Sequence, residues 1–448
     1  MSDVASAADR ARQIQSAIPA GGLFDGATWR ISPDPFPLDP AFAKELESLG
    51  RVLLQFYRAV NLLYRRSVEG KAPAWIAELL DQGKPAELVA RQRDPAFKNE
   101  VPRVIRPDVL LTEEGWAISE LDSVPGGIGL TQWLNESYAG LLGGAPSLIG
   151  GATGMRDGFA SIFGDAPRVH LVVSEESAAY RPEMAWLAER ITSRSVTVRD
   201  TTFTDFAPGD AVYRFFELFD LAQVANSRTI FDLAQAKSIR LTPPPKPIFE
   251  EKLLFALLWN RNLRDTWRQE LGEGFFNRLL KVVPRTWVLD PSPLPPNAGY
   301  PGLELTDWRQ LKGLSQRERE LILKVSGYSE EAWGARGVYL GSDLSSADWS
   351  VAVEKALAAW PRSPHVLQKF HRPRVVESAW YDFARDTLQP MPGRVRLCPY
   401  YFVSGDGDAA RANLGGVLAT VVPADKKIVH GMKDGILAPC AVAAPSAG

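Results

Sequence analysis

One stretch of the sequence, residues 106–129, constrains the fold more than any other. The run Arg106 to Leu111 is rich in branched side chains, and Trp116 to Asp122 alternates apolar and polar residues. Between them, Thr112-Glu113-Glu114-Gly115 has the composition of a turn. Two extended runs separated by a short turn predict a β-hairpin. Side chains two positions apart share one face of a strand, so Arg106 and Asp108 are expected on one face, with Asp108 close to opposite Glu120.

The predicted hairpin gathers three carboxylates, Asp108, Glu120 and Asp122, beside the guanidinium of Arg106. Like charges opposed across strands are destabilising, and a bound cation would relieve the repulsion. Mg²⁺ suits such oxygen ligands, because it usually takes one or two carboxylates plus substrate phosphates. Arg106 would then serve a phosphate or acyl-phosphate oxygen. Alternatively, the carboxylates line a solvated strand face and pair with Arg106. Charge alternation on strands is common, so the pattern alone favours this second interpretation.

The pattern divides the chain into four parts. Residues 1–100 are expected to be mainly helical, since apolar residues recur at three- and four-residue steps over 41–67. Residues 101–165 hold the hairpin and a Gly-rich linker over 143–158. In residues 166–245, apolar runs alternate with a helical segment, which predicts a small Rossmann-like lobe. Residues 246–448 begin with an apolar helix over 250–263 and end in several strands. The fold class is therefore a mixture of α+β and α/β.

Further polar residues are candidates for binding phosphate or substrate. Lys252 begins the apolar helix, Lys324 precedes a glycine-containing segment, and Arg394 and Arg396 alternate on one strand. An ammonium followed by a flexible glycine segment is one way to hold phosphates, although a surface lysine is the more common explanation. The apolar strand around Gln368 leads into a hinge and would suit an adenine edge. Arg214 and Glu217, at the third strand of the Rossmann-like lobe, are candidates for the substrate acid or amine.

Composition excludes several classes of function. The 448 residues carry 51 Lys and Arg against 53 Asp and Glu, a net charge of −2, so nucleic acid and an anionic membrane surface are not expected partners. No apolar run approaches the roughly 20 residues of a membrane helix. The first 18 residues lack the apolar region of a signal peptide, so the expected location is the cytoplasm. Cys398 and Cys440 fit a reducing compartment. Oligomeric state is undetermined.

Taken together, these elements resemble the glutathionylspermidine synthase-like ATP-grasp ligases. In that family the ligand stretch reads Arg-x-Asp, a turn, and Glu-x-Asn, and here it reads Arg106-Pro107-Asp108 and Glu120-Leu121-Asp122. The resemblance implies metal ligands at Asp108, Glu120 and Asp122, with Arg106 as the catalytic residue on the acyl-phosphate side. It also implies a nucleotide site that includes a Gly-rich lid. The resemblance places Lys252, Lys324 and a lid from Gly327 to Gly337 in that site, and the sequence pattern adds Gln368 and Arg396 as further nucleotide-binding candidates.

The family resemblance implies an ATP-grasp fold in circularly permuted order, since the metal ligands precede the nucleotide lysines, with a small Rossmann-like pre-ATP-grasp lobe. It implies a ligase that uses ATP and Mg²⁺ to join a small-molecule acid to an amine through an acyl phosphate. Asp122 stands where the family has Asn, and Val325 where it has Pro, so the level of activity is open. No amidase domain is expected in this length. The alternative is a nucleotide-binding sensor or scaffold without ligase activity.

A carboxylate-based hydrolase is a third hypothesis, and the pattern disfavours it. Glu120 and Asp122 lie two apart on one strand and point the same way, so they cannot easily flank a scissile bond. The sequence does not distinguish which acid and which amine would be joined.

Overall fold

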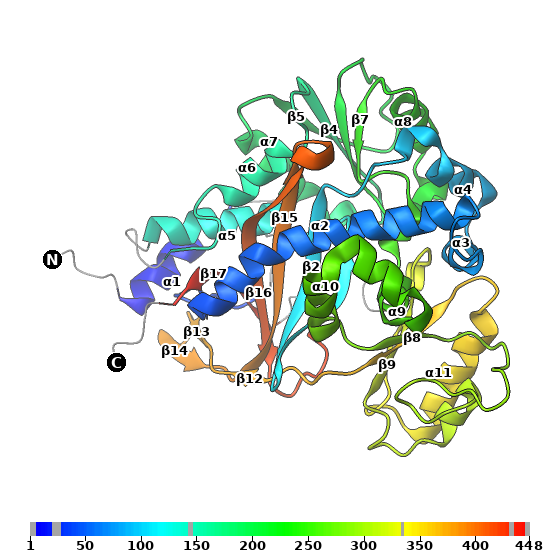
Figure 1. Cartoon of the computed structure of the whole chain (residues 1–448). Coiled ribbons are helices and arrows are strands. Elements are labelled where there is room, and N and C mark those ends of the chain that lie inside the picture. The colour runs from blue at the N-terminus through cyan, green and yellow to red at the C-terminus, as the bar shows by residue number, and fades with distance from the viewer. Residues whose placement is uncertain (1–5, 20–27, 142–146, 333–335, 430–433, 444–448) are drawn as a thin grey trace.

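The computed structural model describes residues 6–19, 28–141, 147–332, 336–429 and 434–443. These residues form a mixed α/β fold built on one large central sheet, two four-stranded sheets and one two-stranded sheet (Figure 1). The central sheet runs in the order β1-β17-β16-β15-β2-β3, and β12 pairs with β15. Its strands are β1 (Phe36–Leu38), β2 (Val104–Thr112), β3 (Gly115–Asp122), β12 (Val375–Val376), β15 (Gly393–Ser404), β16 (Arg411–Pro423) and β17 (Ile436–Val442).

The central sheet separates two hydrophobic cores. Successive side chains of a strand point to opposite faces, so Leu397 and Tyr401 of β15 pack in the core that contains α2 (Pro40–Val68). Cys398 and Phe402 of the same strand pack in the other core, against helices α5 and α6. In Figure 1 the long helix α2 crosses the face of β15 and β16. The sheet is therefore covered by helices on both sides.

The sequence at Asp39 and Pro40 explains where helix α2 begins. Asp39 caps it by accepting hydrogen bonds from the backbone N–H groups of Ala41 and Phe42, and Pro40 occupies the first turn. The other helices of this part are α1 (Ala7–Ser16), α3 (Trp75–Asp81), α4 (Ala86–Arg93), α5 (Ile128–Leu141) and α6 (Gly154–Ser161).

The first four-stranded sheet is parallel throughout, in the order β5-β4-β6-β7. It confirms the strands and the helix that the sequence predicted between residues 168 and 216, and lies at the top of Figure 1. Its elements are β4 (Arg168–Val173), α7 (Arg181–Arg190), β5 (Ser195–Arg199), β6 (Ala211–Phe215), α8 (Ser227–Gln235) and β7 (Arg240–Thr242).

The second four-stranded sheet is antiparallel, in the order β10-β9-β11-β8, and packs against α11. Its elements are β8 (Thr286–Val288), β9 (Leu321–Val325), β10 (Val338–Leu340), α11 (Ser346–Ala359) and β11 (His365–Lys369). Two helices, α9 (Leu253–Trp259) and α10 (Arg264–Val282), precede it, and the two-stranded sheet β13 (Ala379–Asp382) and β14 (Thr387–Pro390) follows it.

The hairpin prediction is confirmed with its register. Asp108 pairs with Glu120, and Arg106 pairs with Asp122, across β2 and β3. A register shift follows Asp108, which adds one residue to β3 between Ile118 and Glu120. The polar side chains of both strands therefore meet where the sequence placed them.

Two predicted segments are wrong in detail. The helix expected over residues 250–263 ends at Trp259, because the side chain of Asn260 accepts a hydrogen bond from the Asn262 N–H and starts a new short turn. The Gly-rich segment 143–158, of which 143–146 lie outside the described residues, includes the start of α6. Its Gly158 lies so close to the Phe402 ring that a Cβ would be 2.3 Å from it, so this glycine permits close packing. Within the described residues, no helix has the length and apolar character to cross a membrane.

Candidate functional site

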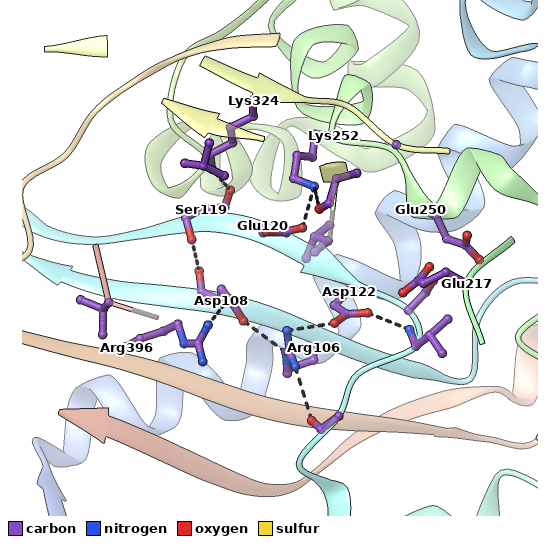
Figure 2. Close-up of a pocket in the computed structure, with 18 of the residues that line it drawn as sticks. Arg106, Asp108, Ser119, Glu120, Asp122, Glu217, Glu250, Lys252, Lys324 and Arg396 are labelled. Carbon is purple, nitrogen blue, oxygen red and sulfur yellow. Dashed lines mark hydrogen bonds and ion pairs between the residues drawn. The ribbon is translucent and has the colours of Figure 1, made fainter. Parts of the chain in front are cut away.

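A cavity of about 390 Å³ opens between the hairpin and the parts of the molecule on either side of it. Strands β2 and β3 form its floor, α9 and β9 bring lysines to one side, and the segment after β6 closes the far end (Figure 2). The predicted residues that line it are Arg106, Asp108, Glu120, Asp122, Lys252, Lys324, Gly327, Arg396 and Glu217. Sequence positions more than 200 residues apart are thus brought to one cavity.

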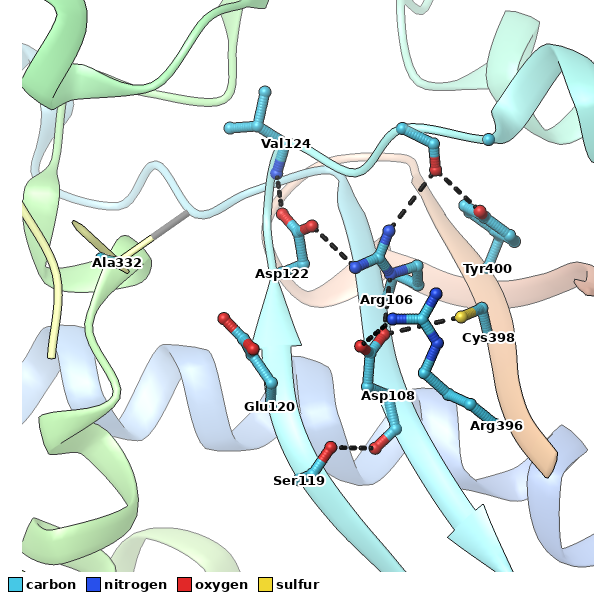
Figure 3. Close-up of polar contacts among 12 residues, drawn as sticks. Arg106, Asp108, Ser119, Glu120, Asp122, Val124, Ala332, Arg396, Cys398 and Tyr400 are labelled. Atoms are coloured by element: carbon cyan, nitrogen blue, oxygen red, sulfur yellow. Dashed lines mark hydrogen bonds and ion pairs between the residues drawn. The ribbon is translucent and has the colours of Figure 1, made fainter. Parts of the chain in front are cut away.

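Arg106 is the centre of the charged network on the floor of the cavity (Figure 3). Its Nη2 lies 2.9 Å from Asp122 Oδ2, and its Nε lies 3.2 Å from Asp108 Oδ1. Asp108 is also held by Arg396, whose Nη1 lies 3.0 Å from Oδ2. Burial lowers the pKa of Arg106, but the two carboxylates outweigh it and keep that pKa well above its ordinary value. The guanidinium is therefore a fixed positive charge.

Two lysines lie above the hairpin carboxylates. Lys252 Nζ lies 2.9 Å from Glu120 Oε1 and donates to the Ala332 carbonyl at 3.2 Å. Lys324 Nζ donates to the Ser119 carbonyl and to Gln368 Oε1, both at 2.9 Å. Burial lowers the pKa of Lys324 to about 8, whereas Glu120 keeps the pKa of Lys252 above its ordinary value despite burial. Both predicted nucleotide lysines thus face the hairpin.

A buried network that the sequence did not reveal fixes the backbone between these lysines. Ser326 accepts the Lys252 N–H on its carbonyl at 3.1 Å and the Leu253 N–H on its hydroxyl at 2.9 Å. Its hydroxyl donates to Glu251, which forms an ion pair of 2.6 Å with Lys84. Both charged side chains are 2% exposed or less. Lys84 comes from the loop between α3 and α4, so no local pattern could have linked it to this site.

The far end of the cavity is acidic. Glu217 is hydrogen-bonded to Glu250, and burial together with Glu250 raises the pKa of Glu217 well above its ordinary value. Glu250 accepts the Leu218 N–H at 2.9 Å and pairs with Arg214. Figure 2 shows Glu217 and Glu250 beside Asp122, away from the two lysines. Four aromatic side chains also line the cavity, namely Tyr180, Phe215, Phe219 and Tyr328.

Several predicted residues have other surroundings. Arg214 is buried and donates to the carbonyls of Pro243 and Phe216, so it holds the acidic pair in place and does not line the cavity. Gln368 is buried between Lys324 and Thr286. A Cβ on Gly337 would meet Val325 Cγ2 at 2.6 Å, which shows close packing on β9. Arg394 donates to the backbone carbonyl of Ala424, outside this cavity.

The proposed lid, Gly327 to Gly337, is described only in part, since residues 333–335 lie outside the described residues. Gly327 lines the cavity, and a Cβ there would be 2.5 Å from the Glu250 carbonyl oxygen. Residues Glu330 to Ala332 form one short turn that places the Ala332 carbonyl at Lys252.

The hairpin carboxylates differ in how well they fit Mg²⁺. Within the described residues, no group of three or more His, Cys, Asp or Glu side chains is arranged as a metal site. Asp108 has both oxygens turned toward arginines. Glu120 fits better, because it lines the cavity, has its side chain 37% exposed, and contacts Lys252 through only one oxygen. Asp122 also lines the cavity, but its Oδ2 pairs with Arg106 at 2.9 Å and its Oδ1 accepts the Val124 N–H at 2.8 Å. One or two carboxylates suffice when phosphates complete the shell, so Glu120 fits the ion, and Asp122 would join it by exchanging one of these contacts.

No protein-family model matches the sequence, and no curated protein matches it in sequence. Among solved structures, a glutathione synthetase-like effector from Globodera pallida matches over 97% of both chains, with a TM-score of 0.55 and 12% identity. The two proteins therefore share a fold. A protein from Methylobacillus flagellatus, described as a gamma-glutamylcysteine synthetase, matches over 86% of both chains at 12% identity, with a TM-score of 0.38.

Proposed function

We propose that this chain is an ATP- and Mg²⁺-dependent ligase that joins a small carboxylic acid to an amine. The observation that carries the proposal is the polarity of the cavity. One end presents Lys252 and Lys324 above the hairpin, and the other presents Glu217 and Glu250 among aromatic side chains. The fold shared with a glutathione synthetase-like protein supports it. We further propose the circularly permuted ATP-grasp order, with residues 166–245 as the Rossmann-like pre-ATP-grasp lobe between the hairpin and the nucleotide-binding part.

The cationic end suits the nucleotide phosphates. Lys252 and Lys324 would neutralise phosphate oxygens, because both ammonium groups are buried and aimed at one region. Glu120 and Asp122 would hold Mg²⁺, which supplies positive charge beside the phosphates when bound. Arg106 and Arg396 would neutralise the carboxylate being activated. Asp108 keeps these two guanidinium groups in place, since it contacts both.

The acidic end suits the amine. A protonated amine entering beside Glu217 and Glu250 would favour loss of the proton that burial keeps on this pair. The neighbouring rings of Tyr180 and Phe219 would attract the same cation and exclude water. The activated carboxylate must be shielded from hydrolysis until the amine attacks, and the segment from Gly327 to Gly337 would cover it.

The competing hypothesis is nucleotide binding without ligation. One measurement distinguishes the two, namely ADP release from ATP and MgCl₂ with acids and amines added singly and in pairs. The acid panel would contain amino acids and short peptides, and the amine panel ammonium, amino acids and diamines. A ligase releases ADP only when one acid and one amine are both present. Binding of Mg-ATP in a thermal-shift assay with no ADP release from any pair would favour the sensor or scaffold.

A further inference from the structure

A second cavity, of about 860 Å³, lies against the reverse side of the strands that border the first. The chain after β11 separates the two. Phe370 and Pro373 line the first cavity, whereas Lys369, His371 and Arg374 line the second. This is the alternation expected of extended chain. The segment is anchored to the hairpin by a hydrogen bond of 2.8 Å from the Arg374 N–H to the Leu111 carbonyl.

We propose that this second cavity binds a small organic anion with a flat aromatic body. The inference does not depend on the proposed ligase activity, since none of the residues that carry it is part of the charged network of the first cavity. Its two components are a group of cations without partners and a wall of aromatic rings.

Arg285 is the principal cation. Its guanidinium lies 5.5 Å from the ring centroid of Trp259 and 5.6 Å from that of Trp287, which fixes it by cation–π contacts. Lys369 lies beside it, because the Lys369 N–H donates to the Arg285 carbonyl at 2.8 Å. Among the described residues, no hydrogen bond or ion pair engages the side chains of Arg285, Lys369 or Arg374. These donors are therefore available to an anion.

Four cations, Lys281, Arg285, Lys369 and Arg374, line the cavity beside His371. Burial and then the charge of Lys369 lower the pKa of His371, and burial and then Arg261 lower the pKa of Arg285. Four acids also line the cavity, but two are already engaged. Asp39 caps α2, and Glu45 accepts the Trp116 indole N–H at 2.9 Å. The other two, Glu114 and Glu377, are exposed.

The aromatic rings that line the cavity are the reason for proposing a ligand with a flat aromatic body. Phe42 and Trp116 pack with their ring centroids 5.7 Å apart, and Trp259 lies on the side of Arg285. The indole N–H groups of both tryptophans are bound, to Glu45 and to the Val283 carbonyl. Stacking on these rings requires no further polar partner. A carboxylate or phosphate on a flat ring would meet Arg285 and Lys369 with its charge.

The experiment titrates the full chain with 2-naphthoate by calorimetry, with 2-naphthamide and acetate as the uncharged and ring-free probes. We expect one-to-one binding of 2-naphthoate, and binding at least tenfold weaker for both other probes. Arg285→Met and Trp116→Ala should each weaken the binding of 2-naphthoate at least tenfold. The control Arg228→Met, at an exposed position, should leave this affinity unchanged. If Arg285→Met fails to fold by circular dichroism, Lys369→Met replaces it.

Lys324→Met provides the test of location, because Lys324 lines only the first of the two cavities. Unchanged 2-naphthoate binding in this variant supports the second cavity. Loss of binding in Lys324→Met would assign the probe to the first cavity and overturn the proposal. Equal affinity for 2-naphthamide, native affinity in Arg285→Met, or no binding at millimolar 2-naphthoate would also overturn it.

Discussion

The ammonium of Lys252 lies 2.9 Å from the carboxylate of Glu120, where the start of α9 meets strand β3. This pair joins a predicted nucleotide lysine to a predicted metal ligand. If phosphate binds Lys252, the ammonium exchanges a carboxylate for phosphate oxygens and Glu120 becomes available to the accompanying ion. The contact therefore represents the resting state of the proposed site.

Glu120→Gln should reduce Mg²⁺-dependent ADP formation at least about 100-fold, since it removes a preorganised charge from the reacting centre. The melting temperature should change little, because the Glu120 side chain is 37% exposed. Glu113→Gln, on the exposed turn of the same hairpin, is the matched control and should keep its rate. A native rate of ADP release in Glu120→Gln would refute the metal assignment.

Nucleotide affinity should depend on the protonation of Lys324. Its pKa of about 8 means that the ammonium is charged at pH 7 and largely neutral at pH 9.5. ADP binding, measured by calorimetry with MgCl₂, should weaken at least about tenfold over this range, because a neutral amine loses its attraction to phosphate. The Lys324→Met variant should bind ADP weakly at both pH values. An affinity that does not vary with pH in the wild-type protein would contradict this role.

Glu217 should affect the amine and not the nucleotide. Glu217→Gln keeps the shape and the hydrogen bond to Glu250 but cannot ionise, so the KM for the amine should rise at least about tenfold. The dissociation constant of ADP should remain close to native, since Glu217 lies beside Glu250 and away from Lys324 (Figure 2). Glu175→Gln, at an exposed site where the carboxylate pairs with Arg181, is the control. An unchanged KM would place the amine elsewhere.

The sequence predicted the hairpin well because a strand repeats every two residues. A slip of one position would turn every polar side chain to the other face, so the positions of Arg106, Asp108, Glu120 and Asp122 determine the register. The observed pairs, Asp108 with Glu120 and Arg106 with Asp122, also require the extra residue in β3, because the register of the turn alone would place Asp108 opposite Ser119. The roles of these residues in metal or phosphate binding stay predictions.

The acidic end and the buried network could not be predicted from local pattern. The sequence pattern predicts only that Glu250 and Glu251 begin a helix, yet Glu250 pairs with Arg214 and Glu251 with Lys84. Both pairings join segments far apart in the chain, and no periodicity records such contacts. Gln368 was expected at the adenine edge, but its side chain is buried against Lys324.

The buried pair Lys84–Glu251 should be important for stability. Lys84→Met leaves the Glu251 carboxylate buried without its cation, which should reduce the free energy of unfolding by about 3–5 kcal/mol. ADP binding should weaken too, because Glu251 orders Ser326 between the two lysines. Lys71→Met, which breaks an exposed pair with Glu69, should change the free energy of unfolding far less. If urea unfolding shows the same loss of unfolding free energy in Lys84→Met and Lys71→Met, burial of the Lys84–Glu251 pair adds nothing to stability.

Lys246 should make stability rise with pH above neutrality. Its ammonium is buried between Asn61 Oδ1, at 2.6 Å, and the Glu100 carbonyl, and burial lowers its pKa to about 7. The unfolded chain keeps this proton up to about pH 10.4. From pH 7 upward the unfolded state therefore binds more protons than the folded state, and the free energy of unfolding rises with pH. The free-energy cost of burying the charged Lys246 is complete below pH 7 and disappears near pH 10. Relative to Lys246→Met, the wild-type protein should gain about 2 kcal/mol between pH 7 and pH 9 in urea unfolding. The exposed Lys98→Met should keep the wild-type slope, and a wild-type slope in Lys246→Met would show that Lys246 does not titrate in this range.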